Sequence, residues 1–375
     1  MNYPESRLIL NGQERATGSQ GTAEVLNPAT EEVLGVLPQA GPDEAAEAAA
    51  IAQQGFAEWS ALSALERGRT LRRAAEIMRE RADQAALTLT LEQGKPLAQA
   101  RGEWMGSADL FDWFAEEARR AYGRIVPPRA AGMQLEVHRR PVGPVAAFAP
   151  WNFPAWTVAQ KVAPALAAGC SVVLKPSEQT VGVAYLMVRA LLDAGLPPRA
   201  IALIWGKPGP IASTLTAAPE IRKITLTGST RVGRIVAAEA GQHLKRVTME
   251  LGGHAPVIVA RDVDLERVTK LAAEWKFRNA GQVCVSPTRF LVEEPVYDDF
   301  VAGLTEAAGK VVVGPGTAEG TTMGPLTTRN QLNTIMALVE DARKRGGTVT
   351  TGGARIGHRG YFHQPTVVAD VTAEM

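Results

Sequence analysis

An alternation of apolar runs with helical segments, between residues 142 and 250, constrains the fold more than any other feature of this sequence. Four strand-like runs lie in this stretch, each followed by a segment expected to be helical: residues 145–148, 171–174, 201–204 and 223–226. Apolar strands separated by helices are typical of a parallel sheet that is covered on both faces. We therefore expect an α/β fold with a doubly wound parallel sheet, and a ligand at the carboxyl ends of its strands.

The sequence on either side of this alternation predicts further elements. Residues 7–40 have the turns of short strands, and four helices are expected from Pro42 to Arg119. Residues 120–141 combine paired prolines with short strand-like pieces, which indicates a hairpin arm for contacts between subunits. A second α/β unit is expected at 251–375, with a helix from Asp264 to Phe277.

Length and composition limit the class of protein. A chain of 375 residues is too long for one simple core, which favours two domains. The formal net charge of +1 gives no basis for nucleic acid or an anionic membrane as a partner. Two cysteines, with no cluster of cysteine and histidine, predict neither a disulfide framework nor a metal site. The N-terminus lacks the pattern of a signal peptide and no apolar run could span a bilayer, so we expect a cytoplasmic protein.

Cys284 is a candidate nucleophile. It follows the helix expected at 264–277, in a segment that Asn279 and Gly281 mark as a turn. A loop between regular elements can expose and hold a reactive side chain, provided that its surroundings favour the thiolate. The alternative is that Cys284 is a small buried apolar residue, as we expect of Cys170.

A glycine-rich segment at residues 228–233 has the composition of an anion site. It lies between an expected strand and an expected helix, where glycine lets backbone N–H groups approach a phosphate and the helix N-terminus favours an anion. It does not match the usual dinucleotide fingerprint, G-x-G-x-x-G. The segment could equally be an ordinary helix start, with Ser229 or Thr230 as its cap.

Lys175 and Glu178 follow the strand expected at 171–174, at its carboxyl end. The lysine can bind hydroxyl or phosphate groups. The carboxylate can accept hydrogen bonds from the two adenosine ribose hydroxyls and would repel a 2′-phosphate, which favours NAD over NADP. The alternative is an exposed lysine beside a glutamate at a helix N-terminus.

Two other polar side chains lie at the ends of expected strands. Glu250 stands before two glycines and is a candidate general base, or else part of a surface turn. Asn152 lies in a loop braced by Pro150 and Pro154, and its amide can donate to an oxyanion. Asn152 could alternatively bond its own backbone in a structural turn.

These segments together resemble the signatures of the aldehyde dehydrogenase superfamily, and the resemblance runs from about residue 8 to 375. Residues 277–282 and 250–256 are most similar to succinate-semialdehyde and 2-oxoglutarate-semialdehyde dehydrogenases. The segments that match the superfamily signatures are 150–154 (PWNFP), 175–178 (KPSE), 226–230 (LTGST), 250–253 (ELGG) and 281–284 (GQVC).

The resemblance implies an enzyme that oxidises a small-molecule aldehyde to the acid with NAD, NADP being the alternative. The Cys284 thiolate would attack the carbonyl, with the Asn152 amide and the Cys284 backbone N–H holding the oxyanion. After hydride transfer, Glu250 would activate the water that hydrolyses the thioester. The residues implied to line the cofactor are Trp151, Lys175, Ser177, Glu178, Gly209, Thr227, Gly228, Ser229, Val232 and Leu251.

Two positions bear on the substrate. Arg278 stands where semialdehyde dehydrogenases carry an arginine that resembles a clamp for the distal carboxylate, and a structural ion pair is the alternative. These relatives usually carry a second arginine before the lysine that matches Lys161. Gln160 occupies that place here, and a neutral amide clamps a carboxylate less well. Ser286 stands where some relatives have a second cysteine, so no local disulfide with Cys284 is expected.

The implied domain organisation is an NAD-binding domain at 1–119 and 142–250, an oligomerisation hairpin at 120–141, and a catalytic domain at 251–375. The family pattern continues with a glutamate–phenylalanine–glycine segment that grips the nicotinamide ribose, and with a final strand that joins subunits. We therefore expect a truncated catalytic domain here, and a homo-oligomer for the complete family member. The alternatives are an inactive NAD-binding protein on this fold, or a cysteine hydrolase that acts on esters through Cys284.

Overall fold

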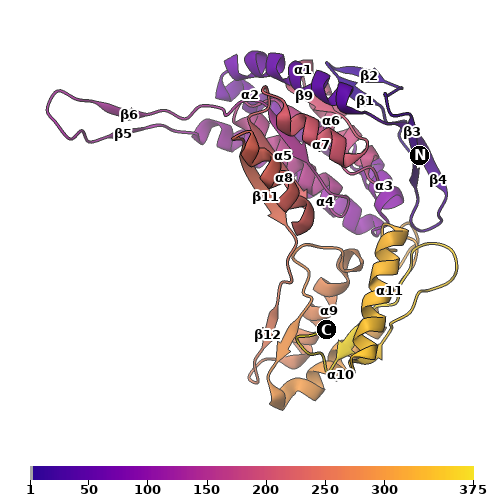
Figure 1. The fold of residues 1–375 in the computed structure, drawn as a ribbon. Coiled ribbons are helices and arrows are strands. Elements are labelled where there is room, and N and C mark those ends of the chain that lie inside the picture. The colour runs from indigo at the N-terminus through magenta and orange to yellow at the C-terminus, as the bar shows by residue number, and fades with distance from the viewer. Residues whose placement is uncertain (1–2) are drawn as a thin grey trace.

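The computed structural model describes residues 3–375, which form a large lobe, a smaller lobe and a long arm that extends from the large lobe (Figure 1). The chain enters through the hairpin of β1 (Leu8–Leu10) and β2 (Gln13–Arg15), and continues with the antiparallel pair of β3 (Thr22–Leu26) and β4 (Val33–Pro38). Asn11 and Gly12 both have positive φ, at 52° and 70°, as a tight two-residue hairpin turn requires. The short strands expected at 7–40 are confirmed.

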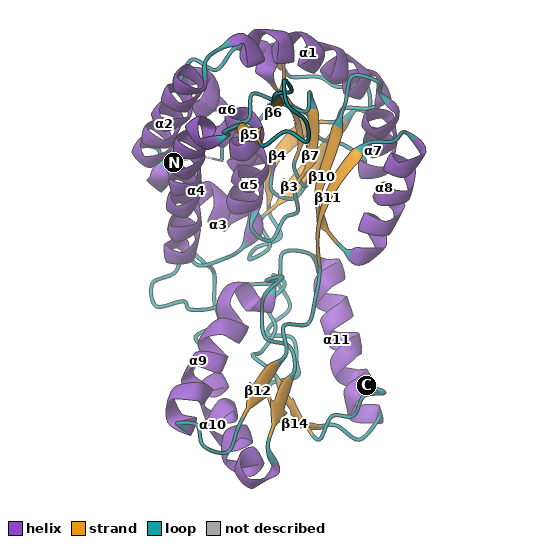
Figure 2. Cartoon of the chain, turned by 90° about the vertical axis from the view of Figure 1, so that its left-hand side faces the viewer, coloured by secondary structure: helices purple, strands orange, loops and turns teal. Residues whose placement is uncertain are grey.

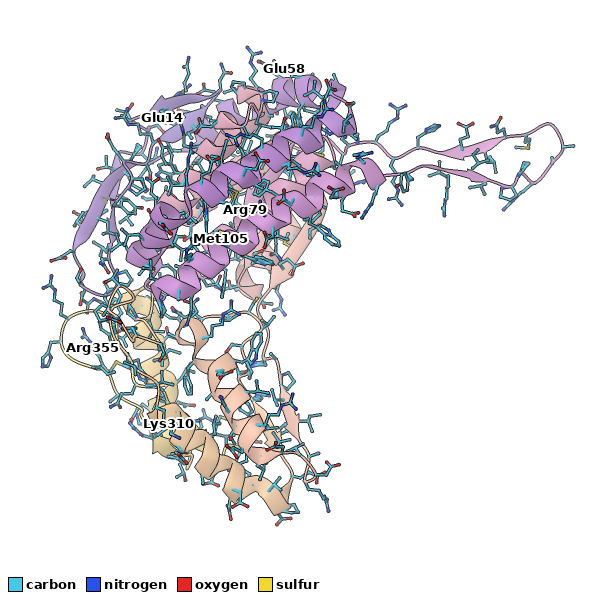
Figure 3. The ribbon with its side chains drawn as sticks, turned by 180° about the vertical axis from the view of Figure 1, so that it is seen from behind. Glu14, Glu58, Arg79, Met105, Lys310 and Arg355 are labelled. Atoms are coloured by element: carbon cyan, nitrogen blue, oxygen red, sulfur yellow. The ribbon has the colours of Figure 1, made fainter. Side chains whose placement is uncertain are left out.

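Four helices follow, as expected: α1 (Pro42–Ala61), α2 (Ala64–Glu80), α3 (Ala82–Gln93) and α4 (Leu97–Glu117). Ser63 and Glu66 form a capping box at the start of α2, and α3 ends at Gly94 with φ of 100°. Figure 3 labels Arg79 on α2. Arg79 pairs with Asp109 and Asp112 of α4, at 2.6 Å each, so the two helices are joined at their surface as well as through the core.

The large lobe is built on a seven-stranded sheet with the order β11-β10-β7-β8-β9-β1-β2. The first parallel strand, β7, is central, with β8 and β9 on one side of it and β10 and β11 on the other. This is the doubly wound arrangement expected from the alternation. Two antiparallel strands extend this parallel sheet at one edge, because β1 pairs antiparallel with β9 and brings β2 with it. The parallel strands are β7 (Val145–Phe148), β8 (Val172–Lys175), β9 (Ile201–Leu203), β10 (Lys223–Gly228) and β11 (Arg246–Leu251).

Helices cover both faces of this sheet (Figure 2). One face carries α5 (Pro154–Ala167) and α6 (Val181–Asp193), packed against α4 and α2, and the other carries α7 (Pro208–Ala217) and α8 (Thr230–Gln242). One continuous apolar core joins these elements, and it includes the completely buried rings of Trp59, Trp104 and Trp205. The short 3-10 turn η2 (Pro198–Ala200) leads into β9.

The arm is an antiparallel hairpin, as expected, formed by β5 (Arg124–Val126) and β6 (Leu135–Val137) after the 3-10 turn η1 (Ala118–Arg120). It projects far from the large lobe (Figure 1). Ile125 is 76% exposed and Val137 is 40% exposed, so the arm has apolar side chains that the rest of residues 3–375 leaves uncovered.

The smaller lobe has its own apolar cluster, which includes Val259, Phe277, Phe300 and Met323. Asp264 caps α9, accepting a hydrogen bond from the N–H of Arg267 at 3.1 Å, so the helix expected at 264–277 is confirmed. The lobe contains β12 (Val257–Val259), α9 (Leu265–Phe277), η3 (Arg278–Gly281), β13 (Phe290–Val292), η4 (Glu294–Val296), α10 (Tyr297–Gly309), α11 (Arg329–Lys344), β14 (Thr348–Thr351) and β15 (Val367–Ala369). Among residues 3–375, no helix combines the length and the apolar character needed to cross a membrane.

Candidate active site

A cavity of about 330 Å³ opens at the carboxyl ends of β7, β8 and β10. This is the edge at which ligands bind in doubly wound sheets. The N-terminal turns of α7 and α8 close its sides. Eight of the ten residues expected along a cofactor line this cavity: Lys175, Ser177, Glu178, Gly209, Thr227, Gly228, Ser229 and Val232.

The other two expected cofactor residues lie outside the lining of this cavity. Leu251 is the last residue of β11 and packs beneath the first turn of α8, where a Cβ on Gly233 would come within 2.5 Å of Leu251 Cδ2. A glycine at 233 thus lets α8 approach β11 closely. Trp151 is half-buried in the turn after β7.

Lys175 and Glu178 form an ion pair at the mouth of the cavity. The Lys175 side chain is 5% exposed, and its Nζ donates to Glu178 Oε1 at 2.6 Å and to the carbonyl of Pro176 at 3.1 Å. The Lys175 ammonium is therefore buried, unlike in the alternative interpretation of an exposed lysine. The Glu178 side chain, at 26% exposed, keeps access to solvent and to a ligand in the cavity.

The start of α8 is capped by Ser229, and this cap leaves other N–H groups of the first turn available for an anion. Ser229 Oγ accepts a hydrogen bond from the N–H of Val232 at 3.3 Å. The helix dipole and the remaining N–H groups of the first turn still face the cavity, where a phosphate would be favoured. Both interpretations of residues 228–233 are therefore compatible with the structure.

Cys284 is exposed, so the alternative of a buried apolar cysteine at this place is wrong. Cys170 is 2% exposed, as expected, and its burial raises the pKa of the thiol. The turn before Cys284 is strained. Asn279, Ala280 and Gly281 have φ of 50°, 53° and 73°, so three consecutive residues are left-handed. Only the glycine adopts this conformation at no cost, which means that the surrounding structure must hold the other two.

Asn152 is brought directly against this turn, although it comes from the loop between β7 and α5. Asn152 Nδ2 donates to the carbonyl of Gln282 at 2.9 Å, and the carbonyl of Asn152 accepts from Asn279 Nδ2 at 2.9 Å. The carboxamide has two N–H groups, so one remains for a ligand beside Cys284. Since Asn152 bonds across the site, the alternative of a self-contained structural turn is wrong.

Glu250 lies inside β11, one residue before its end, and not in a turn after a strand as the sequence suggested. It is exposed on this edge strand. The nearby Lys161 of α5 is 5% exposed and donates from Nζ to Thr227 Oγ1 at 2.6 Å. Burial lowers the pKa of Lys161 to about 8, and the charge of Glu250 acts in the opposite direction. The carboxylate and this lysine thus belong to one electrostatic site.

Sequence reasoning assigned no role to Lys161. A signal was present: the helix has buried apolar residues at 158 and 162, so a lysine at 161 falls among buried positions. An ionisable group inside an apolar helix face is a candidate functional group, because burial without a purpose would be costly.

Arg278 is held by aromatic rings and not by a carboxylate. Its Cζ lies 5.4 Å from the ring centroid of Phe153 and 5.9 Å from that of Trp275. Within residues 3–375 no salt bridge reaches its guanidinium, so the alternative of a structural ion pair is not supported. Gln160 is exposed on α5, although its neighbours Ala159 and Lys161 are buried. An exposed guanidinium without a partner, beside the ring of Phe153, can receive an anionic group.

A buried ion pair that the sequence did not reveal lies behind Asn152. The side chains of Lys95 and Glu103 are each 1% exposed and contact one another directly. Lys95 Nζ also donates to the carbonyl of Asn152 at 2.9 Å, and Glu103 Oε1 accepts from the N–H of Ala155 at 2.8 Å. The pair therefore anchors the loop that carries Asn152 and the start of α5.

The sequence and the fold of this chain are similar to those of known proteins. The model described as the Aldehyde dehydrogenase family matches residues 16–375. 4-(Hydroxymethyl)benzenesulfonate dehydrogenase of Comamonas testosteroni is 44% identical over 371 residues, which cover 98% of this chain and 77% of that protein. NADP-dependent succinate-semialdehyde dehydrogenase of Escherichia coli K12 is 39% identical over 372 residues, covering 99% and 77%. The crystal structure of succinate-semialdehyde dehydrogenase from Burkholderia pseudomallei has a TM-score of 0.97 and 40% identity, over 99% of this chain and 77% of that one.

Proposed function

Because this chain belongs to the aldehyde dehydrogenase family, whose enzymes use NAD or NADP, we propose that it oxidises an aldehyde with an anionic group at its far end, through Cys284 and with NAD. The observation that carries the proposal is that both the turn of Cys284 and the side chain of Arg278 contact the loop that holds Asn152 and Phe153. Asn152 bonds the turn of Cys284, and Arg278 lies unpaired over Phe153, which directly follows Asn152.

The chemistry follows from these side chains. The Cys284 thiolate attacks the aldehyde carbon, and the resulting oxyanion accepts hydrogen bonds from the free N–H of Asn152 and from the Cys284 backbone N–H. NAD, when bound, accepts the hydride, and a thioester on Cys284 remains. Glu250 takes a proton from a water molecule, whose oxygen attacks the thioester carbonyl. The carbon–sulfur bond breaks, the acid leaves and the thiolate is restored.

The cavity at the carboxyl ends of the strands suits a dinucleotide. Its mouth carries the Glu178 carboxylate, which can accept hydrogen bonds from two ribose hydroxyls and would repel a 2′-phosphate. Lys175, bonded to Glu178 at 2.6 Å, fixes the orientation of this carboxylate. We therefore propose a preference for NAD, although the similar enzyme of E. coli is named for NADP.

The proposed substrates carry a carboxylate or sulfonate away from the aldehyde, such as succinic or 2-oxoglutaric semialdehyde. Similar proteins are named for succinate semialdehyde, glutarate semialdehyde and 3-sulfolactaldehyde, all of which have an acidic group. The fork of Arg278 suits such a group. Gln160, where relatives carry a second arginine, supports the competing proposal of a non-acidic aldehyde.

The test compares succinic semialdehyde with butanal, which has the same number of carbon atoms, by initial rates of NADH formation at 340 nm. We expect kcat/KM to be at least tenfold higher for the acidic aldehyde, and Arg278→Leu to remove this preference. Arg101→Leu is the matched control, because Arg101 is an exposed arginine whose salt bridge is with Asp83. Equal kcat/KM values for the two aldehydes in the unaltered chain would favour the non-acidic substrate. Cys284→Ser should abolish oxidation of both.

We also propose that residues 120–141 join subunits, and that the domain boundaries lie near residues 119, 142 and 250. The exposed apolar side chains of the arm support the first of these proposals. Replacing residues 124–137 by a short glycine–serine turn should lower the mass measured by light scattering to that of one chain. An unchanged mass would mean that other surfaces make the oligomer, or that the chain is a monomer.

A further inference from the structure

Four polar side chains that take no part in the proposed chemistry are buried together where the two lobes meet. Gln93 is 0% exposed at the end of α3, Asn279 is 2%, Thr327 is 5% and Gln282 is 9%. They come from segments far apart in the chain, since Gln93 and Asn279 are separated by 186 positions. Burying amides in this way is costly unless each finds a partner.

Gln93 uses every polar group of its side chain in this cluster. Its Nε2 donates to Asn279 Oδ1 at 2.9 Å and to Thr327 Oγ1 at 3.1 Å, and its Oε1 accepts from the N–H of Lys95 at 3.0 Å. The side chain therefore has one allowed orientation. An amide fixed in this way can hold the groups that it contacts in one conformation.

Among its partners, Asn279 has the backbone that most requires support, because it is the first left-handed residue of the turn before Cys284. Asn279 Nδ2 donates to the carbonyl of Asn152, and its own carbonyl accepts from Gln282 Nε2 at 3.1 Å. Gln282 in turn accepts from the N–H of Thr327 at 3.0 Å. Through Asn279, one amide of the large lobe is thus bonded into a chain that reaches both the Cys284 turn and Asn152.

We propose that Gln93 is a positioning residue for the nucleophile. By holding Asn279 in its left-handed conformation, it keeps the turn of Cys284 in register with the Asn152 carboxamide. The part of the inference that concerns catalysis rests on the proposed function of Cys284 and Asn152. The structural part, that Gln93 maintains the strained turn, stands independently of the substrate.

The test uses Gln93→Leu, which keeps a buried side chain of somewhat smaller size and removes its hydrogen bonds. Gln93→Glu is a second variant of nearly the same shape, in case the first does not fold. Thr90→Val is the matched control on the same helix, because Thr90 is 3% exposed and its hydroxyl has no partner within residues 3–375. Hydrogen exchange is measured by mass spectrometry on peptides that cover residues 277–286, with peptides from α6 as the reference.

Exchange at 277–286 should be at least tenfold faster in Gln93→Leu or Gln93→Glu, and within twofold of the unaltered chain in Thr90→Val, since the strained turn opens when its support is lost. Unchanged exchange at 277–286 in a folded Gln93 variant would overturn the proposal. Because hydrogen exchange needs no substrate, this measurement decides the structural part of the inference independently of activity. Failure to oxidise any aldehyde would count against the proposed function and not against the role of Gln93 in the turn.

Kinetics then separates positioning from general destabilisation. Gln93→Leu should lower kcat by about 10- to 100-fold, because small misplacement of reacting groups has effects of this size, while KM for NAD stays within threefold. Gln93→Leu added to Asn152→Ala should lower kcat by no more than about threefold further, because the oxyanion donor that Gln93 positions has already been removed. Full multiplication of the two single effects would show that Gln93 does not act through Asn152.

Discussion

Replacing Lys95 by methionine should destabilise the protein by about 4 kcal/mol, because it would leave Glu103 in the interior without its cation. Both side chains are 1% exposed, so solvent does not screen the pair. Lys95 Nζ also lies 3.9 Å from the ring centroid of Phe153 and donates to the carbonyl of Asn152. Methionine fills nearly the same volume, which means that little of the loss would come from a cavity.

The magnitude follows from what each variant leaves behind. Breaking a buried pair by removing one partner costs about 3 to 5 kcal/mol. Glu103→Gln should cost less, about 2 kcal/mol, because its amide oxygen can still accept from the N–H groups at the start of α5, and a buried lysine can lose its proton. The double variant, Lys95→Met with Glu103→Gln, leaves no buried charge and should cost about 3 kcal/mol. The sum of the losses of the two single variants should therefore exceed the loss of the double variant by about 3 kcal/mol.

The assay is urea unfolding at pH 7 followed by far-ultraviolet circular dichroism, with the free energy of unfolding taken from the transition of the large lobe. Lys310→Met is the control, because Lys310 is 72% exposed and pairs with Glu306 only one helical turn away. It should leave the midpoint unchanged. The reasoning is refuted if Lys95→Met costs less than 1 kcal/mol, or if the losses of the two single variants add up in the double variant.

Three other variants test the site. Asn152→Ala should lower kcat by about 100- to 1000-fold, while the affinity for NAD, measured by fluorescence quenching, stays unchanged. Near-normal turnover would exclude Asn152 as an oxyanion donor. Glu178→Gln should raise the NADP to NAD ratio of kcat/KM at least tenfold, because the repelling carboxylate is gone and Lys175 is free to bind the 2′-phosphate; an unchanged ratio would place the discrimination elsewhere. Burial lowers the pKa of Lys161 from 10.5 to about 8, so the folded chain binds this proton less tightly than the unfolded chain does. The contribution of Lys161 to the free energy of unfolding is therefore fully present above pH 10.5, where the side chain is neutral in both states. This contribution is lost as the pH falls through 8, and the total loss is about 3 kcal/mol. The free energy of unfolding of the unaltered chain should therefore rise relative to that of Lys161→Met between pH 7 and 10, and parallel pH profiles would contradict the shift.

The local features of this protein could be predicted from the sequence because they depend on neighbouring residues. The apolar runs at 145–148 and 171–174 are β7 and β8, since a run of that length flanked by turn residues suits a strand buried on both faces. The turn at Asn11 and Gly12 also depends only on neighbouring residues, and so does the capping of α9 by Asp264. The ends of these apolar runs were sufficient to predict that Asn152 and Lys175 lie at the carboxyl ends of β7 and β8.

Other features depend on contacts between distant segments, which no local pattern records. Hydrophobic periodicity could not predict that β1 would pair antiparallel with β9, because the same run could join any open edge. Glu250 was expected after a strand, but pairing with β10 through Thr227 extends β11 past it. The additional backbone hydrogen bonds come from the partner strand and not from the sequence of β11.

The same holds for the groups that arrange the site. In sequence, Lys95 and Gln93 look like the polar end of a helix, yet both are buried, because the loops of the smaller lobe and the loop of Asn152 close over them. The sequence alone therefore determined which side chains can do the chemistry and on which elements they stand. Only the tertiary structure decided how Asn152 and Cys284 are held together, since burial makes hydrogen bonds between distant segments obligatory, and burial is a property of the whole fold.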